Sequence, residues 1–548
     1  MGANLPSSHQ RFFSMRNPFS RCILFAVALL ILLGVTWKSD RIENVGTQII
    51  KAASTHNKEG HISQQPLGDA PQASDLDIPP ISDHVMDCTI NATYMAELKA
   101  KYELMDGFQY LKRYVKIHRQ PISRKSITKL DQEFLPGTFI KSIDLQNPNF
   151  GNEKCIEPLN VYVPESPYPA TGDLSDFMFG VSTTFKRFSG EKTSPVNEWI
   201  YWLTDGKGKS NGGKLILLLL DATEDQIVHA TTILREAGID VDVYHSDSTM
   251  EMAVRYLTLI PTLYNHPDRP RKKWLVSCDD DTFFPSVHTL VQKFEAFDPT
   301  EQLYIGVLSE DINNVDRHGS QAFGGAGVFL SVPMAEQITR DYETCKTDEK
   351  IKESNSGWGP QGDILLRKCI YENTDVRLSV LHGLYQLDLY NDPSGFYESG
   401  IKPISLHHFK GGGWHNALPW EYTKIAHICG EDCTLQRFQT SDNFIISTGF
   451  SVAHYPQGVN FNLNQMERTF AAAPQDKGWN LDYVFDPQRP SLLKTGRKIS
   501  WDLQEATLTP DNTVHQVYVR KANDWRWVDK DEQPMSQLDG IIELVWVP

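Results

Sequence analysis

The stretch that decides the fold reads Trp274-Leu275-Val276-Ser277-Cys278-Asp279-Asp280-Asp281-Thr282-Phe283-Phe284. Its apolar first half predicts a buried strand, and three consecutive carboxylates follow where that strand ends. Adjacent negative charges repel one another and are poorly solvated beside a buried strand, whereas a divalent cation removes that cost because hard ions take carboxylate oxygens. Ligands also bind at the carboxyl ends of strands in α/β sheets. The stretch indicates a metal site that holds an anionic ligand such as a diphosphate; a solvated acidic turn is the alternative when the triplet is taken alone.

The residues around this stretch alternate between strand and helix patterns. Apolar runs predict strands at 177–182, 214–220 and 241–244, and amphipathic segments predict helices at 196–203, 225–237 and 250–263. This alternation predicts an α/β fold with a mostly parallel, Rossmann-like sheet that has helices on both faces. The predicted nucleotide-binding domain spans residues 174–424.

The regions on either side of this domain have a different texture. Residues 86–173 form a predicted N-terminal extension with a possible helix around 94–114. After about residue 425, aromatic and β-branched residues are interspersed with polar ones, which predicts a β-rich C-terminal region over 425–548.

The N-terminus carries a membrane-targeting pattern. Three arginines precede a nearly unbroken apolar run at residues 22–37, about the lower limit for a membrane-spanning helix. A cleaved signal peptide is the alternative, but no small-x-small cleavage site follows the run. We expect a cytoplasmic tail at 1–21, a signal anchor at 22–37 and a polar stem at 38–85, with the rest luminal. The formal net charge of −16 argues against a nucleic-acid partner.

The cysteines fit an oxidising lumen. Of eight cysteines, Cys22 lies in the predicted span and Cys278 in the strand before the triplet, where a buried thiol fits. The remaining six allow the pairs Cys429–Cys433, Cys345–Cys369 and, less strongly, Cys88–Cys155. Asn91 begins the one glycosylation sequon, Asn91-Ala92-Thr93.

Four further features follow the triplet along the chain. Gly324 and Gly325 precede an apolar run, where they either let backbone approach a ligand or form a tight turn. Asp363 precedes a helical pattern, as a general base or as a helix N-cap. His407 and His408 follow a short apolar run and are a plausible source of a metal ligand. Residues 409–414 form a glycine-rich loop, either a lid or a linker.

The ordered set 279–281, 323–327, 362–363 and 407–408 resembles the Fringe-like glycosyltransferases of family 31, and most closely their fungal and plant Fringe-related branch. The resemblance covers about residues 174–415. It implies a GT-A fold, a UDP-sugar donor, Mn²⁺ and inverting transfer of a hexose or N-acetylhexosamine to a glycan acceptor on protein, lipid or polysaccharide, with a β1,3 linkage. The anchor, stem and luminal head are also the usual layout of a type II Golgi glycosyltransferase.

The resemblance also implies roles for single residues. Asp281 would ligate the metal, with Asp279 and Asp280 supporting the metal or the ribose. The metal-binding histidine falls on His407 or His408, and His407 is preferred because it directly follows the apolar residue. Asp363 falls at the catalytic base. The remaining donor-site positions are Thr183, Thr184, Asp221, Gly324 and Gly325, and Cys345 and Cys369 resemble a paired set in related galactosyltransferases.

Two departures limit the resemblance. Gly362 precedes Asp363 where the family often has an acid, and the region after 425 has no counterpart in Fringe. These departures concern the acceptor and the linkage rather than the donor site. A non-catalytic carbohydrate-binding protein on the same fold is the alternative function, because a fold does not fix a function.

Overall fold

A seven-stranded sheet carries the acidic triplet. Its strand order is β11-β9-β10-β8-β5-β6-β7, in which β8, β5, β6 and β7 are parallel and β10 is antiparallel to β8 and β9. The predicted mostly parallel α/β fold is confirmed. The strands are β5 (Phe177–Thr184), β6 (Lys214–Leu220), β7 (Asp240–His245), β8 (Trp274–Cys278), β9 (Tyr304–Gly306), β10 (Val328–Ser331) and β11 (Ser379–Val380).

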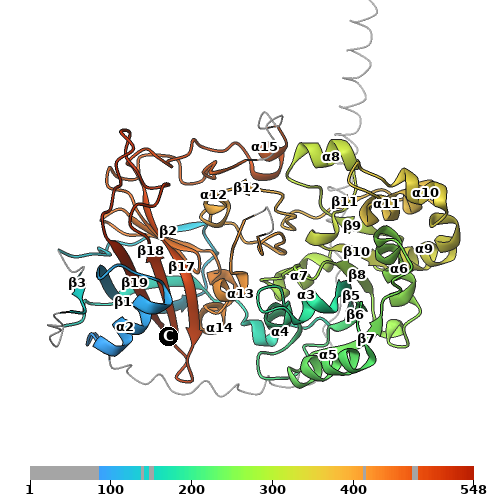
Figure 1. Cartoon of the computed structure of the whole chain (residues 1–548), viewed down its shortest axis with the longest axis horizontal. Coiled ribbons are helices and arrows are strands. Elements are labelled where there is room, and N and C mark those ends of the chain that lie inside the picture. The colour runs from blue at the N-terminus through green and yellow to red at the C-terminus, as the bar shows by residue number, and fades with distance from the viewer. Residues whose placement is uncertain (1–85, 138–140, 147–153, 412–414, 472–478) are drawn as a thin grey trace, which may run out of the picture. The chain divides into compact units, whose positions relative to one another are not determined.

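Helices cover both faces of this sheet (Figure 1). One face packs against α4 (Val196–Leu203), α5 (Glu224–Glu236) and α7 (Val287–Phe294). The other face packs against α6 (Met252–Tyr264), α9 (Val332–Cys345) and α11 (Gly362–Asn373). Short helices complete this region: α3 (Phe185–Ser189), α8 (Ile312–His318), α10 (Asp348–Glu353) and α12 (Ser394–Tyr397). Because both faces are covered, the central strands read as apolar runs rather than as alternating patterns.

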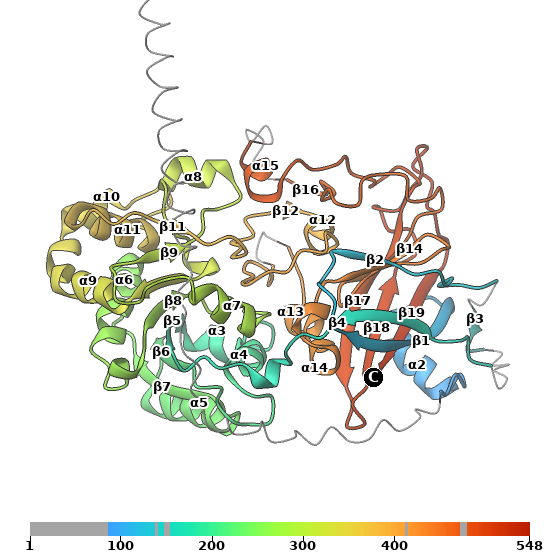
Figure 2. The same cartoon turned by 180° about the vertical axis from the view of Figure 1, so that it is seen from behind.

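A second, ten-stranded sheet joins the two ends of the described chain. Its order is β2-β13-β14-β15-β17-β18-β19-β1-β3, and β4 pairs with β1 beside β3. Strands from the N-terminal extension are β1 (Gly107–Gln120), β2 (Ile127–Lys129), β3 (Lys141–Asp144) and β4 (Leu159–Pro164). Strands from the C-terminal region are β13 (Arg437–Gln439), β14 (Phe444–Ser447), β15 (Ser451–His454), β17 (Ile499–Leu508), β18 (Val514–Arg520) and β19 (Asp539–Val547). Figure 2 shows this sheet from behind.

This sheet confirms the predicted β-rich C-terminal region and adds the extension to it. Strand β19 lies between β18 and β1, parallel to β1. The N-terminal extension and the C-terminal region therefore form one sheet, although the sequence patterns predict them as two separate regions. The predicted boundaries of these regions stay predictions. The remaining elements are α13 (Pro419–Tyr422), α14 (Ala426–Cys429), α15 (Trp479–Phe485), and the strand pair β12 (Tyr390–Asn391) and β16 (Phe470–Ala471).

The helix predicted around 94–114 is wrong in its second half. Helix α2 (Ala92–Lys101) ends before Gly107, where β1 begins. The segment that follows is rich in aromatic and β-branched residues, and it pairs on both sides with β19, β3 and β4. Strand pairing with a segment more than 400 residues away overrides the local helical pattern.

All three predicted disulfides form: Cys88–Cys155, Cys345–Cys369 and Cys429–Cys433. Cys278 is a buried free thiol, as predicted. Asn91 is exposed and caps α2, because its Oδ1 accepts from the amides of Thr93 at 2.8 Å and Tyr94 at 3.1 Å. A glycan would attach through Nδ2, so the cap and the predicted modification use different atoms.

The structure is a computed structural model that describes residues 86–137, 141–146, 154–411, 415–471 and 479–548. The predicted tail, anchor and stem lie outside these ranges. Within them, no helix has both the length and the apolar character that a membrane span requires.

Ile542→Ala tests the position of β19 in the ten-stranded sheet. Ile542 is 1% exposed, pairs with Leu111 and Tyr518 on the adjacent strands, and packs with them in one core. Truncation in such a core costs about 2–5 kcal/mol, so urea denaturation will show a loss of that size. The control Val228→Ala, at a side chain that is 62% exposed, will leave the free energy of unfolding nearly unchanged. Equal stability of the two variants would contradict this packing.

Candidate functional site

The predicted donor-site residues lie at one edge of the seven-stranded sheet. In the parallel registers, Val181 pairs with Cys278 and Thr184 pairs with Leu220. The residues that follow these strands, including Asp221 and Asp279, therefore share the carboxyl edge with Thr183 and Thr184. This is the edge where α/β sheets bind their ligands.

The centre of the site is a cluster of Asp279, Asp281 and His407. The His407 Nε2 atom lies 3.1 Å from Asp281 Oδ1 and 3.4 Å from Asp279 Oδ2. One potential ligand atom from each residue lies within 4.8 Å of the other two. The Asp279 side chain is 45% exposed and that of Asp281 14% exposed, so the cluster opens to solvent on the Asp279 side.

Charge concentrates strongly in this cluster. Burial alone would raise the pKa of Asp281, but the adjacent His407 holds it below its ordinary value. Burial alone would lower the pKa of His407, but the charges of Asp281 and Asp279 raise it well above its ordinary value. Two carboxylates therefore hold a positive charge between them, which is the environment that a divalent cation prefers.

The orientation of His407 suits a metal ligand. Its Nδ1 lies 3.2 Å from the carbonyl oxygen of Gln386, and a hydrogen bond there leaves Nε2 directed at the carboxylates. Gly325 makes room for the ring, since a Cβ on Gly325 would lie 2.1 Å from His407 Cε1. Thr282 ties this turn to the triplet, because its hydroxyl accepts from the Asp279 amide at 3.0 Å and donates to the Gly325 carbonyl at 2.9 Å. The residues present fit a divalent cation.

His408, the second histidine, belongs to a different set of contacts. Its Nδ1 lies 2.9 Å from Asp388 Oδ1, and Asp388 is almost fully buried and accepts from Asn314 at 2.7 Å. His408 also has a left-handed backbone, with φ of 55°. Of the two histidines that the sequence left open, the structure brings His407 to the acids.

The three acids of the triplet have different partners. Asp280 is buried and binds Arg187 through two contacts, of 2.7 Å from Nε and 2.5 Å from Nη2. It also accepts from the Thr183 hydroxyl. Thr184 caps α3 by accepting from the Arg187 amide at 3.1 Å. Asp280, Thr183 and Thr184 therefore position this edge of the sheet, and their predicted contacts with a nucleotide sugar stay predictions.

Asp363, the predicted base, lies in the first turn of α11, and the N-cap of that helix is Gln361. Asp363 is therefore not the N-cap of α11, which was the alternative role. Burial, and then the charge of Asp279, raise the pKa of Asp363 to about 7. The nearby Gly324 amide and Tyr256 hydroxyl act against this rise. A carboxyl group with a pKa near neutral pH is well suited to take a proton.

Tyr256 is a residue that the sequence reasoning missed. A Cβ on Gly324 would lie 2.5 Å from the Tyr256 hydroxyl oxygen and 3.0 Å from Asp363 Oδ1. A Cβ on Gly362 would lie 2.4 Å from Tyr256 Cβ. Two glycines from separate segments thus admit the phenol beside the carboxylate. Burial, followed by the charge of Asp363, raises the pKa of Tyr256 well above its ordinary value, so the phenol stays a donor.

The glycine-rich loop carries a cation, Lys410, in its described part. Lys410 lies 3.1 Å from Glu198 Oε1 and donates to the carbonyl oxygens of Thr193 and Ser194 at 3.3 and 3.1 Å. Its charge is therefore already compensated. Residues 412–414 lie outside the described residues, so the lid stays a prediction.

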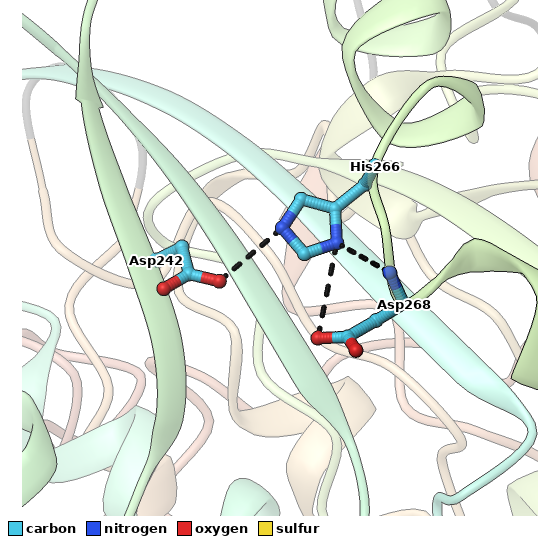
Figure 3. Close-up of side chains that lie close together, drawn as sticks. All are labelled: Asp242, His266 and Asp268. Atoms are coloured by element: carbon cyan, nitrogen blue, oxygen red, sulfur yellow. Dashed lines mark hydrogen bonds and ion pairs between the residues drawn. The ribbon is translucent and has the colours of Figure 1, made fainter.

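A second group of possible metal ligands lies at the edge strand β7: Asp242, His266 and Asp268. Figure 3 shows both carboxylates directed at the imidazole between them. The nearly buried ammonium of Lys214 lies 2.8 Å from Asp242 Oδ2 and 3.5 Å from Asp268 Oδ2. Burial alone would lower the pKa of Lys214, but its hydrogen bonds to Asp240 and Asp242 raise it. Because a lysine already neutralises these acids, we read the group as a structural ion-pair network.

Gly325→Ala tests the place of His407 in the cluster. The added Cβ would overlap the imidazole, so the affinity for Mn²⁺ in calorimetric titration will fall by at least about tenfold, as for loss of an orienting contact. Gly107→Ala is the matched control, since a Cβ there meets nothing within 4 Å. An unchanged affinity in a folded Gly325→Ala protein would remove His407 from the metal site.

Part of the chain is similar to a known protein family. Residues 223–395 match the family described as Fringe-like. The match includes the triplet, Gly324, Gly325 and Asp363, and ends before His407. No curated protein sequence matches the chain.

Solved structures give distant likenesses. The apo form of mouse xyloside xylosyltransferase 1 has 12% identity over 38% of this chain and 85% of its own, with a TM-score of 0.26. The galactosyltransferase LgtC, in complex with donor and acceptor sugar analogs, has 9% identity over 40% and 77%, with a TM-score of 0.28. The glycosyltransferase GlyE of Streptococcus pneumoniae TIGR4 has 14% identity over 45% and 60%, with a TM-score of 0.29. The match of residues 223–395 to the Fringe-like family confirms the predicted resemblance and supports the glycosyltransferase class that it implies.

Proposed function

We propose that the chain transfers a hexose or N-acetylhexosamine from a UDP-sugar to a hydroxyl of a glycan acceptor, with inversion, a β1,3 linkage and a requirement for Mn²⁺. The observation that carries the proposal is the arrangement of two carboxylates and His407 near a half-buried carboxyl group, Asp363, whose pKa is raised to about 7. The Fringe-like match over 223–395 supports the choice of reaction.

The cluster gives the donor side of the reaction. Asp279, Asp281 and His407 would hold the cation, because carboxylates and imidazole suit Mn²⁺. When bound, the cation would supply a Lewis acid that offsets the charge of the departing diphosphate. Asp221, exposed and with a left-handed φ of 56° at the end of β6, lies at the same edge and supports the predicted contact with uridine or ribose.

Asp363 gives the acceptor side. A carboxylate that accepts the proton of the attacking hydroxyl suffices for inversion by direct displacement. The Gly324 amide and the Tyr256 hydroxyl lie beside Asp363, where they favour the ionised form of its carboxyl group.

The compartment is part of the same proposal. Three disulfides favour an oxidising environment. Together with the sequence pattern at 22–37, they support a type II protein of the Golgi or endoplasmic reticulum membrane with a luminal catalytic part.

Calorimetric titration of residues 86–548 with UDP tests the donor site. UDP will bind in the presence of Mn²⁺, and its affinity will fall at least about tenfold without the cation. Asp281→Ala will abolish the gain from Mn²⁺, whereas Asp242→Asn, in the ion-pair network at β7, will retain it. Two results would contradict the assignment of the donor site. One is UDP binding that does not depend on Mn²⁺, and the other is loss of the Mn²⁺-dependent gain in UDP affinity in Asp242→Asn but not in Asp281→Ala.

Asp363→Asn tests the chemical step, with UDP release from UDP-sugars measured over a panel of glycan acceptors. The variant will bind UDP with Mn²⁺ as the wild type does and lose about 10²-fold or more in rate, as expected for loss of a general base. In the wild type, the rate will fall as the pH drops through the pKa of Asp363, because protonation removes the base. This acid limb will lie at or below about pH 7, since a cation offsets the charge of Asp279 that raises the pKa.

Two outcomes would contradict parts of this proposal. Surviving transfer in Asp363→Asn would place the base elsewhere. Binding of UDP with no turnover of any UDP-sugar in the wild type would favour the non-catalytic carbohydrate-binding alternative.

A further inference from the structure

The segment just before Asp363 presents an unusually exposed aromatic ring. Trp358 is 78% exposed, the largest fraction among the exposed large hydrophobic side chains of the described ranges. It lies in the loop between α10 and α11, five residues before Asp363. Leaving a tryptophan in water forgoes the large gain that its burial would bring. Tryptophan is enriched in binding surfaces, because its ring combines a large apolar face with a polar N–H group.

The loop holds this ring in a defined place. Asn355 Oδ1 accepts from the amides of Gly357 at 2.8 Å and Gly359 at 3.1 Å. The loop closes through a bridge between Asn355 and Pro360 and a hydrogen bond from the Gln361 amide to the Ser354 carbonyl at 3.0 Å. Trp358 therefore stands on a closed turn whose ends are fixed.

The two glycines beside Trp358 serve the backbone conformation. Gly357 has a φ of 97° and Gly359 a φ of 94°, and a Cβ on either would meet nothing within 4 Å. Lack of space therefore does not explain glycine here; the left-handed backbone on both sides of Trp358 does. The two glycines therefore favour a turn conformation in which the indole of Trp358 is exposed to solvent.

A second exposed apolar side chain lies on α6, the helix that carries Tyr256. Gly362, which ends the loop, packs on Tyr256. Met252 lies one helical turn before Tyr256 on the same face of α6 and is 53% exposed. Apolar surface therefore adjoins the Tyr256–Asp363 pair from two separate elements.

We propose that Trp358 is a platform for the acceptor, on which the apolar face of a pyranose ring stacks while a hydroxyl of the acceptor reaches Asp363. This inference rests on the proposed function and adds the acceptor side to it. The indole face carries partial negative charge, and the C–H groups of a pyranose face carry partial positive charge. One indole matches one sugar ring in size.

A protein partner fits this surface less well. Specific protein interfaces bury about 800 Å² on each partner and centre on an apolar core. Here the residues that flank Trp358 in the sequence are, apart from Pro360, polar residues and glycines: Asn355, Ser356, Gly357, Gly359 and Gln361. A single ring among polar groups matches a ligand that presents apolar C–H faces and hydroxyls together.

Saturation-transfer NMR tests the platform directly. The probes are lactose, cellobiose, mannobiose and N,N′-diacetylchitobiose, each added to residues 86–548 with UDP and Mn²⁺. At least one disaccharide will receive saturation from the wild type, and Trp358→Ala will weaken its binding by about tenfold. Trp358→Tyr will recover part of the signal, because a smaller ring still stacks.

Trp525→Ala is the matched control, since Trp525 is also an exposed tryptophan, at 57%, but lies in the C-terminal region. This variant will bind the disaccharide as the wild type does, and UDP affinity will be equal in all variants. The platform is overturned if no disaccharide signal depends on Trp358, or if Trp525→Ala loses it equally. Failure of the proposed function has a different signature, namely a wild type that does not bind UDP with Mn²⁺.

Discussion

The repulsion between Asp279 and Asp281 is the constraint on which the rest of the site depends. Both acids follow a fully buried strand, and His407 compensates them at 3.1 and 3.4 Å. Holding the imidazole there requires a glycine at 325, the Gln386 carbonyl and the Thr282 hydroxyl. Each of these comes from a different segment, so the cluster exists only when the whole sheet and its connecting turns are formed.

Identical residue types acquire different chemistry from their surroundings. Asp280 is neutralised by Arg187, Asp281 by His407, and Asp279 remains partly exposed and raises the pKa of Asp363. The group at β7 has a similar composition, yet Lys214 supplies its positive charge internally. The difference between a candidate metal centre and an ion-pair network lies in where the compensating cation comes from.

Sequence patterns predicted those parts of the site that are local. The strand before the triplet, the glycines at 324 and 325, the acid at 363 and the pair Cys429–Cys433 all carry signals within a few residues. Arg187 and Tyr256 carried none, because a residue on a short helix or on an amphipathic helix looks structural until distant segments meet it. The pairing of β1 with β19 was likewise hidden, since local propensity says nothing about a partner at the other end of the chain.

The position of the cation is the most direct test of this arrangement. A crystal of residues 86–548 soaked with MnCl₂ and UDP, measured with anomalous scattering, will show a peak in contact with Asp281 and His407 and with the UDP diphosphate. A peak at Asp242, His266 and Asp268 instead, or UDP bound with no cation at Asp281, would contradict it.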